Sequence, residues 1–93
     1  MKISLEMSIS REDFLRLLPS AVGQVVVAAQ DGVFGGGDDH YRWEIRLQKL
    51  EDRRLGSVVL PFHRVDIRLE GHSEDEAAAF MTRFQRGFQR GGG

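Results

Sequence analysis

The sequence predicts a two-layer α+β domain in which helices cover one face of an antiparallel five-stranded sheet. Three observations predict this class. Apolar and polar residues alternate in three segments, apolar residues recur with helical spacing in two others, and the connections between the later strands are short. The expected order is strand, helix, four strands and a long C-terminal helix, and the close succession of the four strands favours an antiparallel meander.

The length and charge of the chain suit one small domain. It has 93 residues, 13 Lys and Arg, 14 Asp and Glu, a formal net charge of −1 at pH 7 and no Cys. A domain of this size buries only roughly 60–65% of its unfolded surface, so an enclosed ligand cavity would compete with the core for apolar side chains. The low net charge provides no overall field for nucleic acid, and the lack of Cys excludes thiolate metal sites and Cys nucleophiles. We expect a single domain over residues 1–90 and a flexible glycine tail, residues 91–93.

The first two predicted elements are a strand and a short helix. Residues 2–8 alternate with the period of two that is typical of a half-buried strand. Ser10 is a typical helix N-cap and is followed by acidic residues, which favour the positive end of the helix dipole. We expect the helix to weaken at Pro19 and to end by Gly23.

The middle of the chain predicts two strands with a loop between them. The β-branched segment 24–29 is typical of a buried strand. Residues 31–40 hold four glycines and three acids, which indicates a flexible loop at the tip of a hairpin. The alternation of residues 41–48 is the clearest strand pattern in the sequence.

Two further strands are expected before the last helix. Residues 51–54 predict a charged turn, and residues 55–60 a fourth strand that stops at Pro61 because proline has no amide to donate. After a turn, the alternation of residues 64–70 predicts the fifth strand.

The last helix is predicted from its start signal and its apolar stripe. Ser73 and Glu76 have the spacing of a capping box. Phe80, Phe84 and Phe88 recur every four residues, so their rings should lie on one helix face and cover the sheet.

The predicted core lies between the sheet and both helices. The inward residues of the sheet are expected to be Ile3, Leu5, Met7, Tyr41, Trp43, Ile45, Leu47, Val65, Ile67 and Leu69. The first helix should add Phe14, Leu17 and Leu18. In layout alone, this order of elements resembles the TATA-binding-protein-like and helix-grip architectures, in which a curved antiparallel sheet holds a long C-terminal helix.

Two groups of arginines are candidate binding residues for nucleic acid or a protein partner. The outward face of the sheet is expected to carry Arg42, Arg46, Arg64 and Arg68, and the last helix and tail carry Arg83, Arg86 and Arg90. Such a face could hold a phosphate backbone. The interleaved acids favour a solvated lattice of cross-strand ion pairs instead, and the last arginines suit a frayed helix end.

The glycine-rich loop and the histidines are candidate ligand sites. Carboxylates at Asp38 and Asp39 with the imidazole of His40 could bind a divalent cation, although their spacing matches no calcium loop. We expect a mobile hairpin tip here. His40, His63 and His72 are all expected at the surface, at strand ends or turns.

No set of residues has the spacing of a catalytic or cofactor site, so we expect a non-enzymatic interaction module that needs no cofactor. It would dock on a protein partner or form a homodimer through exposed sheet edges. The alternatives are a nucleic-acid-binding domain that uses the arginines, and a small ligand-binding or metal-binding protein that uses the acidic glycine-rich loop. No segment approaches the ~20 apolar residues of a membrane span and the N-terminus lacks a signal pattern, so we expect a cytoplasmic protein without a membrane partner.

Overall fold

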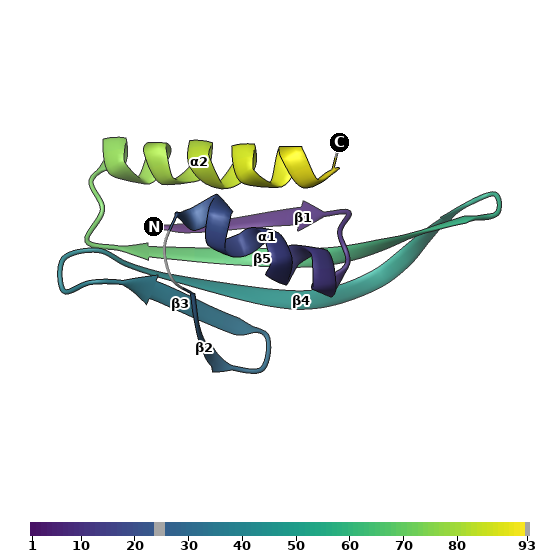
Figure 1. Cartoon of the computed structure of the whole chain (residues 1–93), viewed down its shortest axis with the longest axis horizontal. Helices are drawn as coiled ribbons and strands as arrows, with labels where there is room; N and C mark the ends of the chain where they lie inside the picture. The colour runs from purple at the N-terminus through teal and green to yellow at the C-terminus, as the bar shows by residue number, and fades with distance from the viewer. Residues whose placement is uncertain (24–25, 93) are drawn as a thin grey trace.

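The computed structural model describes residues 1–23 and 26–92, apart from the side chains of Ala29 and Arg90. Its elements are β1 (Lys2–Met7), α1 (Arg11–Val22), β2 (Val27–Gln30), β3 (Val33–Gly37), β4 (Arg42–Leu55), β5 (Val58–Glu70) and α2 (Glu74–Gly92) (Figure 1). All strands join one antiparallel sheet in the order β1-β5-β4-β3-β2. The α+β class and the predicted order of elements are confirmed. No helix in the described part of the chain is long and apolar enough to cross a membrane.

The core lies between the two helices and one sheet face, as predicted. Phe84 and Phe88 are buried, while Phe80 is half-buried at the margin. The ring of Phe88 stacks on Phe14 of α1 with 5.0 Å between centroids and lies 4.7 Å from Phe84. The buried core cluster comprises Phe14, Leu18, Ala21, Val22, Phe34, Trp43, Ile45, Val65, Ile67, Leu69, Ala77, Phe84 and Phe88.

The predicted ends of α1 are confirmed. Ser10 is the N-cap, and its hydroxyl accepts a hydrogen bond from the Asp13 amide. Gly23 takes the left-handed conformation with φ of 68°, and its amide donates to the Pro19 carbonyl at 2.8 Å. Pro19 lies inside the helix, which continues for one more turn beyond it.

The capping box of α2 is also confirmed. The Ser73 amide donates to Glu76, and the Glu76 amide donates to the Ser73 hydroxyl. The helix runs through Gly91 to Gly92, so it includes two of the three tail glycines. Gly93 lies outside the described residues, and the flexibility of residues 91–93 stays a prediction.

The predicted turn at residues 51–54 and the strand stop at Pro61 are wrong. Strands β4 and β5 run continuously through these positions as one long hairpin. The turn lies instead at Gly56 and Ser57. Gly56 has a φ of 64°, as expected for the two-residue turns that match the twist of paired strands.

A β-bulge explains why Pro61 does not end β5. The pairs that flank it, Leu50 with Phe62 and Arg53 with Leu60, leave two residues of β4 opposite Pro61. The ladder is already interrupted at a bulge, so a residue without an amide is tolerated there.

The predicted flexible loop over residues 31–40 is also wrong, because half of it is strand β3. Val33 and Phe34 are buried. Gly36 pairs with Trp43, and a Cβ atom on Gly36 would lie only 2.5 Å from the indole ring. The glycine thus makes room for a core side chain rather than for chain flexibility.

The second strand is not the buried strand that segment 24–29 predicts. Strand β2 begins at Val27 and lies at the edge of the sheet, with only β3 beside it. Val27 is 62% exposed as a result. Residues 24 and 25 of the predicted strand lie outside the described residues.

Two residues have the opposite burial from that predicted. Tyr41 precedes β4 in a turn and is 42% exposed, so it is not part of the core. His63 is buried rather than at the surface, and its Nδ1 donates to the Ile9 carbonyl at 2.8 Å. It alternates in phase with Val65 and Ile67, which assigns it to the helix-covered face.

Candidate interaction surfaces

The sheet face turned away from the helices is the open face. Strand alternation directs its charged residues to this side, and the register confirms that they lie in rows across β1, β5 and β4. These residues are Lys2, Glu6, Arg42, Glu44, Arg46, Arg64, Asp66, Arg68 and Glu70. The four sheet arginines that the sequence singles out are therefore brought together.

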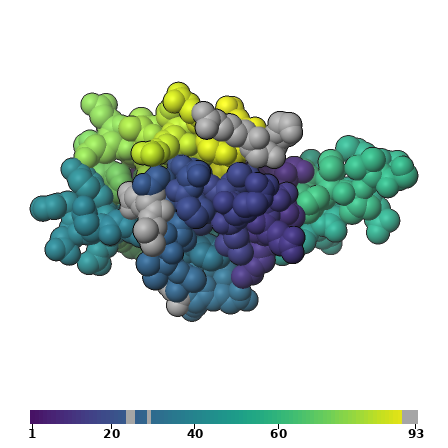
Figure 2. All heavy atoms as spheres, viewed as in Figure 1, coloured from purple at the N-terminus to yellow at the C-terminus, as the bar shows by residue number. Residues whose placement is uncertain are grey.

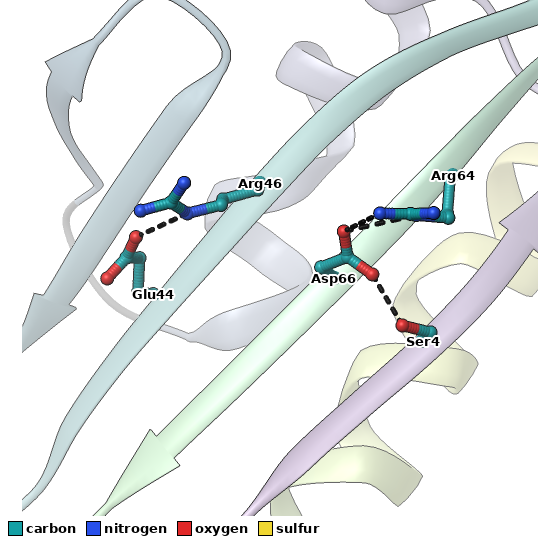
Figure 3. Close-up of polar contacts among 5 residues, drawn as sticks. All are labelled: Ser4, Glu44, Arg46, Arg64 and Asp66. Carbon is teal, nitrogen blue, oxygen red and sulfur yellow. Dashed lines mark hydrogen bonds and ion pairs between the residues drawn. The ribbon is translucent and has the colours of Figure 1, made fainter.

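Three of these arginines pair with an acid two residues away on their own strand. The pairs are Arg46 with Glu44 at 2.9 Å, Arg64 with Asp66 at 3.1 Å and Arg68 with Glu70 at 3.1 Å. Figure 3 shows the first two pairs. These contacts run along the strands, whereas the sequence predicts pairs between strands. All are partly solvated, so each stabilises the fold by only about 0–1 kcal/mol.

The Asp66 carboxylate accepts hydrogen bonds from two neighbouring side chains of the open face. The Ser4 hydroxyl donates to it from β1 (Figure 3). This hydrogen bond, together with Arg64 and the charge of Arg46, lowers the pKa of Asp66 below its usual value.

We expect Asp66→Asn to destabilise the fold by roughly 1 kcal/mol at neutral pH and by less in acid. Because the folded state lowers the pKa of Asp66, its stabilising effect is complete above the unfolded value of about 3.9 and is lost as pH falls through the folded value. Urea unfolding at about pH 7 and at about pH 3 measures this difference.

The control is Asp39→Asn, since Asp39 is exposed and forms no ion pair with any described residue. An equal effect of Asp66→Asn at both pH values would contradict the coupling of Asp66 to its neighbours.

Two hollows of about 340 Å³ each indent the open face. They share Glu44 and Arg68 as lining residues. One of them reaches Gly35 and Gly36 of β3, which carry no side chains to fill it. Within residues 1–23 and 26–92, no three His, Cys, Asp or Glu side chains are grouped to hold a metal ion.

The arginines of α2 lie on the other side of the molecule from the open face. Arg83 and Arg86 line a hollow with residues of α1. The Arg83 guanidinium covers Gly23 so closely that a Cβ there would lie 2.3 Å from its Cζ. It therefore lies at the C-terminus of α1, where a cation complements the helix dipole. The side chain of Arg90 lies outside the described residues.

The metal candidates Asp38, Asp39 and His40 lie together in the turn between β3 and β4. Asp38 Oδ1 accepts hydrogen bonds from the amides of His40 at 2.8 Å and Tyr41 at 2.9 Å. The bond from Tyr41 and then that from His40 lower the pKa of Asp38. The Asp38 carboxylate is thus occupied in shaping the turn.

A polar cluster that the sequence does not reveal joins this turn to the start of α2. A hydrogen bond with Glu76 raises the pKa of Tyr41. Backbone bonding to Ser73, and then the bond with Tyr41, lower the pKa of Glu76. The ring of His72 lies 5.4 Å from that of Tyr41. Glu76, which caps α2, therefore also fixes the position of the turn between β3 and β4.

The far end of the β4–β5 hairpin, residues 50–62, projects from the rest of the molecule, and we call it the arm (Figures 1 and 2). Strand β3 pairs with β4 only from Arg42 to Arg46, and β1 pairs with β5 only as far as His63. Within the arm, Arg53 lies over the Phe62 ring at 4.4 Å.

The end of the arm carries an exposed apolar patch, the apolar tip. Its members are Leu55 at 64%, Val58 at 52% and Val59 at 47% exposure. The sequence signal for it is the apolar run 55–60, which predicts a fourth strand of the sheet. The projection of the arm leaves this run in water.

No known family model and no curated protein sequence matches this chain. Its function is therefore inferred from these surfaces.

Proposed function

We propose that this chain is a non-enzymatic protein-interaction module that self-associates through the arm. The apolar tip is the observation that carries the proposal. Exposed apolar residues scattered singly are ordinary, but three of them within five residues at the end of a projecting element are typical of a surface that a partner covers.

The shape of the arm supports the same function. The described molecule measures 47 × 26 × 20 Å, and the hairpin extends along its length. Beyond the ends of β1 and β3, the outer edges of the arm have no neighbouring strand in the part of the chain that the structure describes. Unpaired backbone groups at a strand edge are able to pair with a strand from another chain.

The two alternative functions have less support. Nucleic-acid binding would require the sheet arginines to exchange their carboxylate partners for phosphates. Phe62, which alternation places on the same side of β5, is half-buried and lies under the Arg53 guanidinium rather than free for base stacking. A metal site in the β3–β4 turn would compete with the two amides that Asp38 already accepts from.

The test is a variant in which the apolar tip is made polar by combining Leu55→Ser, Val58→Thr and Val59→Thr. We expect self-association to weaken at least about tenfold, because burial of these side chains drives it. Sedimentation velocity over a wide concentration range measures the change, and circular dichroism confirms the fold.

Val27→Thr is the matched control, because Val27 is equally exposed on the edge strand β2 away from the arm. Self-association that is unchanged in the tip variant, or a wild-type chain that stays monomeric throughout, would refute the proposal.

A further inference from the structure

We propose that the arm binds a second copy of this chain, with the two β4 edges paired antiparallel across a two-fold axis between Asp52 and Arg53. This inference rests on the proposed function and specifies its geometry. Isologous pairing requires an edge that is complementary to itself. The outer edge of β4 in the arm meets this requirement in backbone, charge and length.

The backbone favours the edge of β4 over that of β5. The Leu69 amide donates toward β1, to the Met1 carbonyl, and every second amide of β5 points the same way. Pro61 falls at such a position and has no amide, so the outer edge of β5 is interrupted. On β4, the Leu47 amide donates to Gly32, just before β3, and none of the described strands lies beyond that bond.

The charges of the β4 edge are complementary to themselves when reversed. Residues 50–55 read Leu, Glu, Asp, Arg, Arg, Leu. In the proposed register, Glu51 lies opposite Arg54 of the second copy and Leu50 opposite Leu55. Asp52 and Arg53 flank the axis with their side chains on opposite faces of the hairpin, since Asp52 contacts Lys49 and Arg53 lies over Phe62. Opposite charges and apolar residues directly across an antiparallel pair stabilise it.

In the single chain, the two outer charges of this segment have no ion-pair partner among the described residues. Glu51 and Arg54 form no ion pair with any residue that the structure describes, whereas Asp52 pairs with Lys49 at 2.6 Å. A second copy in this register would supply a partner for each unused charge. It would also cover Leu55, the most exposed member of the apolar tip.

The bulge in β4 makes this register feasible. In a regular strand, Glu51 and Arg54 would direct their backbone groups to opposite edges, because the direction alternates with each residue. Alternation from Leu47 directs Glu51 outward. On the other side of the bulge, Leu55 closes the turn with Val58, so Arg54 points outward as well. Both residues can then pair across the axis.

The free edge also has the right length. In this register Gly56 of the second copy lies opposite Lys49. The turn of the second copy therefore ends before Leu47, where β3 begins to occupy the edge. The two arms can pair along their full length without meeting β3.

Two charge-reversed variants test the register. The first combines Glu51→Arg and Asp52→Arg, and the second combines Arg53→Glu and Arg54→Glu. In each variant alone, residues 51–54 of both copies carry four charges of the same sign and repel each other across the axis. We therefore expect its self-association to weaken at least about tenfold. Mixed in equal amounts, the two should form a heterodimer of near wild-type affinity. Glu12→Arg combined with Asp39→Arg is the control for net charge outside the arm.

A cross-linking measurement checks the same register independently. The chain has no Cys, so Leu50→Cys and Leu55→Cys each introduce a single thiol. A mixture of these two variants should form disulfide-linked dimers faster than either variant alone, because the two positions lie opposite each other across the axis.

The outcomes separate this inference from the proposed function. If the charge-reversed variants associate as the wild type does and mixing has no effect, the register is wrong. The proposed function would still stand in that case, provided that the variant with the apolar tip made polar no longer self-associates. If neither the polar tip nor the reversed charges change association, both are refuted.

Discussion

Phe84→Ala is expected to lower the free energy of unfolding by about 3–5 kcal/mol, a large part of the roughly 5–15 kcal/mol that stabilises a domain. Phe84 is only 1% exposed, and its ring lies 4.7 Å from that of Phe88. Truncation removes apolar burial and leaves a cavity that the two helices and the sheet can close only in part. Urea unfolding followed by the fluorescence of Trp43 measures the loss, because this single Trp is buried in the same core.

Phe62→Ala is the matched control for Phe84→Ala. Phe62 is only half-buried, lies in the arm and contacts the Arg53 guanidinium, so its loss should cost about 1 kcal/mol. Equal costs for the two variants would mean that the phenylalanine row of α2 is not the main contact between helix and sheet.

Gly87→Val should destabilise the fold by about 3 kcal/mol or more. A Cβ atom on Gly87 would lie 2.6 Å from Ala21 Cα and 2.7 Å from Ala21 Cβ. The conflict is with backbone, so it can be relieved only if α1 and α2 move apart, which would disturb the Phe14–Phe88 stack. Thermal unfolding monitored by circular dichroism measures the effect.

Helix propensity alone predicts the opposite sign for Gly87. Glycine is about 0.8–1 kcal/mol less favourable than alanine inside a helix, so a substitution at a free position would stabilise it. Gln85→Val, on the exposed side of the same helix, is the control and should change stability by only a few tenths of a kcal/mol. Equal stability of the two variants would show that the helices do not meet at Gly87.

Part of the candidate site was predictable. The four sheet arginines lie together on the open face because strand alternation alone assigns them to it. The sequence could not show that their direct partners lie on the same strand, because side-chain conformation decides between neighbours along and across the sheet. The burial of His63 was predictable too, since it continues the alternation of residues 64–70. The expectation that Pro61 ends a strand places His63 in a turn instead.

The sequence could not predict the arm, for a different reason. Whether residues 55–60 lie inside the sheet or project beyond it depends on where β1 and β3 stop pairing, and both strands are far from the hairpin in sequence. The charge pattern of residues 50–55 indicates pairing with a second copy only because the structure leaves this edge of β4 free.

The sequence by itself determined the α+β class, the order of elements, the caps of both helices and the inward position of most core residues. These properties depend on side-chain periodicity and on capping groups within a few residues of one another. Only the tertiary structure decided the lengths of the strands, the role of the glycines beside Trp43, the close contact at Gly87 and the free edge of the arm. Those features depend on pairing between distant segments, as in the contact of Ser4 with Asp66, which lie 62 residues apart in the chain.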